Sequence, residues 1–221
     1  MEIEKPAGRV LPIWLVVGFL GAGKTTLLRH LVKSTHGQEY IYIVNEFSAV
    51  DVDAAQIERA GGVALAVAGG SIFCRCLVTE FVSVMRRIKD GFHIGGRIIR
   101  PQGVVIEVSC LADPRSMRKL LAESHLDDFF RVAGVTVVVD PGFLMRLLLI
   151  LPNIKGQIQA ADLILFNKID LRPPAMIEKV REKVRTINPQ AEIIACVQCD
   201  VAPELILWDE NSETVKNVDA E

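Results

Sequence analysis

The strongest constraint on this chain is a glycine-rich segment near its N-terminus, GFLGAGKT at residues 18–25. It fits the pattern G-x-x-x-x-G-K-[ST], which is typical of phosphate-binding P-loops. An apolar run at residues 13–17 precedes it, and a helix-forming run at residues 26–33 follows it. Glycines let the backbone turn its N–H groups toward polyphosphate, and a helix N-terminus favours an anion. The segment predicts a nucleotide site; the alternative is an ordinary glycine-rich turn between a strand and a helix.

The P-loop pattern assigns a role to each of its polar residues. Lys24 is expected to reach the β- and γ-phosphates, and the Thr25 hydroxyl is expected to bind Mg²⁺. The residues expected to contact the phosphates are Gly21, Ala22, Gly23, Lys24, Thr25 and Thr26.

Glu107 closes a short apolar run at residues 104–107 and is the candidate Walker B acid. An acid fixed at a strand end can reach Mg²⁺ directly or through water. The alternative is a buried acid in a structural salt bridge. Asp140 also ends an apolar run, but no motif assigns it chemistry, so we expect it to cap the following turn.

A second motif, NKID at residues 167–170, follows the apolar run at residues 163–166 and matches N-K-x-D, the guanine-recognition pattern of GTPases. Asp170 is expected to accept hydrogen bonds from the guanine N1–H and 2-amino groups. Asn167 is expected to help hold the N7/O6 edge, and the stem of Lys168 to cover the base. The motif therefore favours GTP and GDP; the alternative is a polar turn that caps a strand.

Short apolar runs alternate with helix-forming segments along the whole chain. Strands are expected at residues 40–44, 63–67, 104–107, 135–139, 163–166 and 193–197, and further helices at residues 79–89 and 176–187. This alternation predicts an α/β fold, a three-layer P-loop NTPase sandwich with a mainly parallel central sheet. Residues 91–103 are expected to form a surface excursion. Since ligands bind at the carboxyl ends of such strands, the polar motifs should converge on one crevice.

Composition narrows the class of protein further. The 221 residues carry a net charge of -2, which gives no indication of nucleic acid or an anionic membrane as partner. The apolar runs are too short for a membrane span, and residues 1–10 lack the apolar core of a signal peptide. Five cysteines, an odd number, suit a reducing cytoplasm. We expect a loose arm at residues 1–10, one domain at residues 11–208 and a polar, flexible tail at residues 209–221.

Several motifs in register resemble the CobW/HypB/UreG family of P-loop GTPases, on its CobW-like branch. GFLGAGKTT at residues 18–26 is that branch's own P-loop sequence, and NEF at residues 45–47 resembles its first switch segment. EVSCLADP at residues 107–114 resembles the family's E-x-S-G-L-A-D-P. Residues 157–171 resemble its Q-x-x-x-A-D-x-x-x-x-N-K-x-D-L. The resemblance covers residues 11 to about 205.

The resemblance implies a Mg²⁺-dependent GTPase that delivers a metal or a metallocofactor to a client protein. Lys24 and Glu107 would act in catalysis, and Glu46 is a candidate to position water, unless it contacts Mg²⁺ instead. Intrinsic turnover is expected to be slow, with a partner completing the site. The alternative function is a GTP-dependent switch that activates a partner enzyme, such as a corrinoid enzyme, without carrying metal. An ATP-dependent kinase is disfavoured by NKID and by the lack of a lid segment.

This chain departs from the branch pattern at its cysteine motif, which is usually G-C-x-C-C. Aligned on Gly70, only Cys74 of the three thiols is present, and Cys76 adds another two residues on. Two thiolates could ligate Zn²⁺ or another soft metal if a nucleotide-dependent homodimer supplied two more. The alternative is that both cysteines are remnants in a switch loop. Ser48-Ala49 replaces the usual Gly-Glu, Cys110 replaces a glycine, and the branch's C-terminal domain is not expected here.

A second cysteine pair, Cys196 and Cys199, also has metal-like spacing and should lie near the guanine base. Cys196 is expected to point into the core, which disfavours metal there. The four histidines form no ligand spacing with any cysteine and are expected at the surface: His30, His36, His93 and His125.

Overall fold

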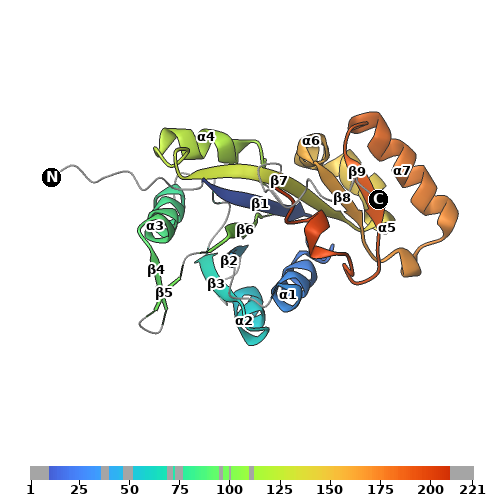
Figure 1. Ribbon diagram of the computed structural model, residues 1–221. Coiled ribbons are helices and arrows are strands. Elements are labelled where there is room, and N and C mark those ends of the chain that lie inside the picture. The colour runs from blue at the N-terminus through green and yellow to red at the C-terminus, as the bar shows by residue number, and fades with distance from the viewer. Residues whose placement is uncertain are drawn as a thin grey trace, which may run out of the picture.

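The computed structural model describes residues 10–35, 40–46, 52–68, 72, 77–94, 97–99, 101–109 and 112–209. Within these ranges the chain forms a seven-stranded parallel sheet in the order β3-β2-β6-β1-β7-β8-β9 (Figure 1). Its strands are β1 (Leu11–Gly18), β2 (Tyr40–Glu46), β3 (Val63–Ala68), β6 (Gly103–Glu107), β7 (Phe130–Val139), β8 (Leu163–Phe166) and β9 (Glu192–Ala195).

Helices cover both faces of this sheet. One face packs against α1 (Lys24–Ser34) and α2 (Val52–Arg59). The other face packs against α3 (Val78–Lys89), α4 (Ser116–Glu123), α5 (Pro141–Ile150), α6 (Pro152–Ala160) and α7 (Pro174–Ile187). In Figure 1 the pair α1 and α2 lies below the sheet, and α4 and α6 lie above it. The expected three-layer sandwich is confirmed.

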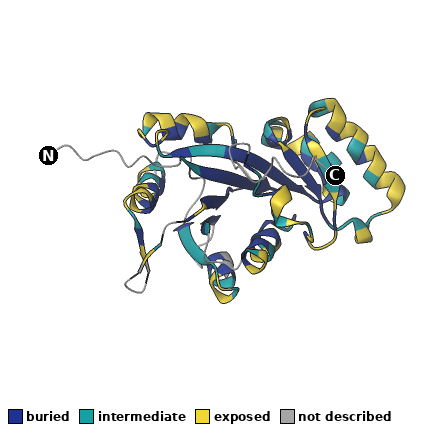
Figure 2. Cartoon of the chain, in the orientation of Figure 1, coloured by how far each residue is buried: buried dark blue, intermediate teal, exposed yellow. Residues whose placement is uncertain are grey.

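Two hydrophobic cores lie on opposite faces of the sheet, and β1 contributes to both. Ile13, Leu15 and Val17 belong to one core, whereas Trp14 and Val16 belong to the other. A strand that is covered on both faces needs apolar side chains at successive positions, which explains the continuous apolar runs of the sequence. Figure 2 shows the result, with buried central strands and exposed outer faces on the helices.

Several elements differ from their expected bounds. β7 begins at Phe130 rather than at residue 135, and β9 ends at Ala195 rather than at residue 197. The expected excursion at residues 91–103 contains an antiparallel hairpin, β4 (Phe92–Ile94) and β5 (Arg97–Ile99), followed by the first residue of β6. Two short 3₁₀ helices, η1 (Ile169–Leu171) and η2 (Pro203–Leu205), follow β8 and β9.

The last described residues pack onto the sheet. The indole Nε1–H of Trp14 donates to the carbonyl oxygen of Trp208 at 2.8 Å. Asp209 is buried and forms an ion pair with Arg131, so the packed chain extends one residue beyond the expected boundary at 208. Residues 210–221 lie outside the described part. No described helix combines the length and apolar character needed to cross a membrane.

Candidate nucleotide-binding site

The P-loop, Glu107 and the NKID motif contribute residues to a single crevice at the carboxyl ends of the central strands. The P-loop contributes Gly21, Gly23 and Lys24, and β6 contributes Glu107. The segment after β8 contributes Asn167, Lys168 and Asp170. The full lining is Leu20, Gly21, Gly23, Lys24, Thr25, Thr26, Arg29, Glu107, Asn167, Lys168, Asp170, Leu171 and Gln198. This is the convergence that the strand-end positions of the motifs predict.

The P-loop forms a tight turn that presents the start of α1 to the crevice. Gly21 and Gly23 have φ of +75° and +118°. Glycine adopts such conformations readily because it has no Cβ, whereas other residues disfavour them. The first helical hydrogen bond runs from Leu27 N–H to Gly23 O at 3.0 Å. The backbone N–H groups of Lys24, Thr25 and Thr26 therefore precede the hydrogen-bonding pattern of the helix. Such amides, together with the helix dipole, suit a phosphate group.

Lys24 and Glu107 are both buried and form an ion pair, with Nζ 3.5 Å from Oε1. Glu107 pairs in register with Val16 of β1, which places it beside the P-loop. The Thr25 hydroxyl and the Glu107 carboxylate both line the crevice and are hard oxygen ligands. This set of donors fits Mg²⁺.

Glu46 is the last residue of β2, and its side chain lies outside the described part of the structure. Its expected role in positioning water therefore stays a prediction.

Asn167 connects the P-loop to the segment that follows β9. Its side chain is buried; Nδ2 donates to Ala22 O at 2.8 Å, and Oδ1 accepts from Cys199 N–H at 2.9 Å. Asn167 therefore holds two walls of the crevice in place. The expectation that it also holds the guanine N7/O6 edge stays a prediction. Asp170 is exposed in η1 and lines the same crevice, as guanine recognition requires.

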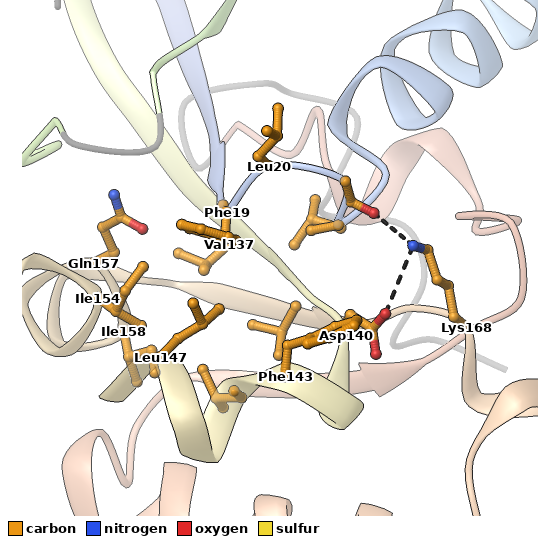
Figure 3. Close-up of a pocket in the computed structure, with 16 residues that line it drawn as sticks. Phe19, Leu20, Val137, Asp140, Phe143, Leu147, Ile154, Gln157, Ile158 and Lys168 are labelled. Atoms are coloured by element: carbon orange, nitrogen blue, oxygen red, sulfur yellow. Dashed lines mark hydrogen bonds and ion pairs between the residues drawn. The ribbon is translucent and has the colours of Figure 1, made fainter. Parts of the chain in front are cut away.

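Lys168 has a left-handed backbone, with φ of +62°, and its side chain reaches back over the P-loop. Its Nζ donates to Gly21 O at 2.5 Å and lies 3.6 Å from Asp140 Oδ2 (Figure 3). Lys168 therefore fixes the NKID segment to the phosphate loop, while its stem lines the crevice where the base is expected.

Asp140 caps α5, as expected, by accepting a hydrogen bond from Gly142 N–H at 2.9 Å. Its carboxylate also binds Arg172, with Nε to Oδ1 and Nη2 to Oδ2 both at 3.0 Å. Burial acts to raise the pKa of Asp140. The hydrogen bonds from Arg172 and Gly142 and the positive charges of Arg172 and Lys168 outweigh it, so the pKa is lowered. The sequence analysis predicted the capping role of Asp140 but not its ion pairs with Arg172 and Lys168.

A second cavity, of about 140 Å³, lies on the other side of the P-loop, between it and helices α5 and α6 (Figure 3). Phe19 and Leu20 of the P-loop face Phe143, Leu147 and the apolar residues of α6 across it. Its lining is chiefly apolar, so it does not suit polyphosphate. The polar crevice is the better site for a nucleotide.

The structure leaves the cargo-metal prediction open, because Cys74 and Cys76 lie outside the described residues. Within the described ranges, no three His, Cys, Asp or Glu side chains lie close enough together to hold a metal ion. Cys196 is buried, as expected.

Of the histidines, His93 and His125 are exposed, and His36 lies outside the described residues. His30 is partly exposed, with Nε2 3.3 Å from Asp200 Oδ1.

Two polar residues of the crevice, Arg29 and Gln198, were missed by the sequence analysis. Arg29 lies four residues after Thr25 on α1, a spacing that puts both side chains on one helix face. That spacing could have identified Arg29. Gln198 also lines the crevice and has a left-handed backbone, with φ of +53°. No pattern in the sequence indicates it.

A parallel sheet with a glycine-rich loop between β1 and α1 defines the class of P-loop nucleotide-binding domains. Residues 12–195 match the family described as CobW/HypB/UreG, nucleotide-binding domain. The chain therefore belongs to the CobW/HypB/UreG family, and the resemblance seen in its motifs is confirmed.

The curated relatives of this chain include proteins called zinc chaperones. The chain is 30% identical to the zinc chaperone YjiA of Escherichia coli over 192 residues, covering 86% of this chain and 59% of YjiA. It is 28% identical to the zinc chaperone CobW of Pseudomonas aeruginosa over 240 residues, covering 95% of this chain and 62% of CobW. The chain thus spans about three fifths of the length of these relatives.

Among solved structures, the Zn(II)-bound YjiA GTPase from Escherichia coli superposes with a TM-score of 0.65 at 24% identity. The match covers 90% of this chain and 61% of the YjiA chain. At this level of identity the comparison supports the fold and carries no assignment of individual site residues.

Proposed function

We propose that this domain is a Mg²⁺-dependent GTPase that acts in the delivery of a metal or metallocofactor to a client protein. One observation carries the nucleotide part of this proposal. The phosphate-loop residues Lys24 and Thr25, the acid Glu107 and the base-recognition residue Asp170 line the same crevice. Phosphate, magnesium and guanine ligands are thus available to one bound nucleotide.

Different residues of the crevice would bind the phosphates, stabilise the transition state and hold Mg²⁺. The N–H groups at the start of α1 would hold the phosphates, and Lys24 would stabilise charge that develops on the transferred phosphoryl group. Thr25 and Glu107 would hold Mg²⁺, which neutralises phosphate charge when bound. Within the described residues, both acids of the crevice, Glu107 and Asp170, already have other roles. We therefore expect slow intrinsic hydrolysis, with Glu46 or a partner positioning water.

The metal-delivery part rests on the family and on relatives called zinc chaperones. In this chain the candidate cargo ligands are Cys74 and Cys76. Two thiolates are half of the four ligands that Zn²⁺ usually takes in a closed site. A symmetric pair of domains across bound GTP would supply four, and metal, dimer and GTP would then strengthen one another.

A second function is favoured by the reduced cysteine motif. With one of the usual three thiols present, plus Cys76, the domain could change conformation with GTP and activate a partner enzyme without carrying metal. The two functions share the nucleotide site and differ only in their output.

Sedimentation with Zn²⁺ and a non-hydrolysable GTP analogue separates the two functions. Metal delivery predicts that Zn²⁺ shifts the protein from monomer to dimer and stays bound. Cys74→Ser and Cys76→Ser should each abolish this shift without changing GTP affinity, whereas Cys110→Ser should leave it intact. If the Cys74 and Cys76 variants dimerise and bind Zn²⁺ as well as the parent, the switch without metal is the better account.

A further inference from the structure

The wall of the crevice after β9 carries two cysteines, Cys196 and Cys199, that the proposed hydrolysis does not use. Their exposed fractions are 5% and 0%. The two residues between them, Val197 and Gln198, are exposed, and Gln198 lines the crevice. The thiols therefore flank a residue that would face bound nucleotide.

Both cysteines contact residues of the nucleotide site. Cys199 N–H donates to Asn167 Oδ1 at 2.9 Å, and Cys196 Sγ lies 3.9 Å from the same oxygen. The Cys199 thiol donates to Gly23 O, at the start of α1, at 3.4 Å. The two thiols are also close enough to affect each other's pKa. The dithiol therefore lies between the NKID motif and the P-loop.

The backbone at this point is in a conformation that its residues do not favour. Gln198 and Cys199 have φ of +53° and +56°, and neither is glycine. A left-handed conformation is disfavoured for a residue with a side chain. The contacts of Cys199 with Asn167 and Gly23 help to offset this cost. Changing these contacts would therefore also move Gln198 in the wall of the crevice.

We propose that Cys196 and Cys199 form a reversible disulfide that weakens nucleotide binding, so that this pair is a thiol-modification site beside the P-loop. The oxidant is a low-molecular-weight disulfide such as glutathione disulfide. One cysteine thiolate attacks it, forming a mixed disulfide and releasing one thiol. The second cysteine thiolate then attacks the mixed disulfide and releases the other thiol. The protein loses two electrons and two protons, and the oxidant is reduced to two thiols.

The surroundings of the two thiols indicate which one attacks first. The neighbouring Cys199 side chain lowers the pKa of the Cys196 thiol. The neighbouring Cys196 side chain, together with burial, raises the pKa of the Cys199 thiol. Since the thiolate is the nucleophile, Cys196 is the attacking residue and Cys199 the resolving one.

The disulfide would loosen the site for two reasons. A disulfide sulfur carries no hydrogen, so the donation from Cys199 to Gly23 O is lost. For the same reason, the donation from the Cys196 thiol to Asn167 Oδ1 is lost. Losing these hydrogen bonds is expected to weaken nucleotide binding about tenfold. By linkage, bound nucleotide should make the disulfide harder to form.

Mass mapping tests the modification itself. The whole chain is treated with glutathione disulfide with and without GDP, alkylated and digested. Cys196 and Cys199 should be found in one unalkylated peptide, lighter by two hydrogens than its reduced form, and GDP should slow its appearance. Reduction should restore both thiols. If both cysteines become alkylated after oxidation, the proposal is overturned.

Calorimetry with GDP then tests the consequence, and this readout rests on the nucleotide binding proposed above. Oxidation should weaken GDP binding about tenfold in the parent and in the Cys110→Ser control. Cys196→Ser, compared with itself before and after oxidation, should show no change, whereas Cys199→Ser should stop at the mixed disulfide of Cys196. A disulfide that forms without altering GDP affinity would overturn the regulatory role. If the reduced parent itself does not bind GDP, the proposed function is wrong. The disulfide is then still tested by mass mapping, which does not depend on nucleotide binding.

Discussion

Lys24 and Glu107 form a buried ion pair at the base of the crevice, with 3.5 Å between Nζ and Oε1. Each partner is also the residue expected to bind one component of Mg·GTP. A phosphate oxygen would replace the carboxylate beside Lys24, and Mg²⁺ would replace the ammonium beside Glu107. The ion pair thus keeps two buried charges compensated until nucleotide and metal arrive together.

Replacing Lys24 with alanine should reduce GTP hydrolysis by about 100-fold or more, because it removes a positive charge that stabilises the transition state. Lys33→Ala is the matched control, since Lys33 is an exposed lysine on the same helix. Phosphate release at saturating GTP measures both variants. Undiminished hydrolysis by Lys24→Ala would remove the P-loop from the mechanism.

Glu107→Gln should slow hydrolysis and raise the Mg²⁺ concentration needed for half-maximal rate, because an amide is a weaker ligand for a hard cation than a carboxylate. Binding of GDP without metal should stay nearly unchanged. Hydrolysis measured across a Mg²⁺ titration provides the first value, and metal-free calorimetry the second. An unaltered Mg²⁺ dependence would show that Glu107 is a structural acid only.

Two P-loop glycines should respond differently to alanine. A Cβ on Gly23 would lie 2.3 Å from Asn167 Nδ2 and 3.1 Å from Cys199 Sγ. On Gly21 it would meet no described atom within 4 Å. Gly21→Ala should therefore cost about 1–2 kcal/mol of unfolding free energy, from its left-handed backbone alone. Gly23→Ala should cost more and should also weaken GDP binding, as urea unfolding and calorimetry would show. Equal losses in the two variants would contradict the close packing at Gly23.

Asp140→Asn should destabilise the domain by about 1 kcal/mol at pH 7, because it removes the charge paired with Arg172 and Lys168. The pKa of Asp140 is lower in the folded state than the ordinary value of about 3.9. Its stabilisation is therefore complete above that value and is lost as the pH falls through the folded pKa. Urea unfolding at pH 7 and near pH 3 should show the difference between parent and variant shrinking. A difference that stays constant with pH would mean that the charge contributes nothing.

The parts of the fold that could be predicted from sequence are those with local causes. β8 has the bounds expected from its apolar run, since a strand covered on both faces needs apolar residues throughout. The turn between β1 and α1 follows from the glycines of the P-loop. α5 was not predicted, because its sequence PGFLMRLLLI is almost entirely apolar. Without polar residues at regular intervals, no helical period can be recognised.

The parts of the site that could not be predicted from sequence depend on contacts between residues far apart in the chain. Asn167 connects Ala22 to Cys199, and Lys168 connects Gly21 to Asp140. These contacts exist because the sheet brings the ends of β1, β7, β8 and β9 together. A linear motif identifies Asn167 and Lys168 as polar residues of a site, but it does not show which groups they hold.

The most direct measurement compares the affinities of GDP and ADP for the parent and for Asp170→Ala by calorimetry. The parent should bind GDP at least about tenfold more tightly than ADP, because Asp170 is expected to accept hydrogen bonds that only guanine donates in that arrangement. Asp170→Ala should lose most of this preference, whereas Asp200→Ala, which removes an exposed acid outside the crevice lining, should keep it. Equal affinities of the parent for GDP and ADP would contradict a guanine-specific site.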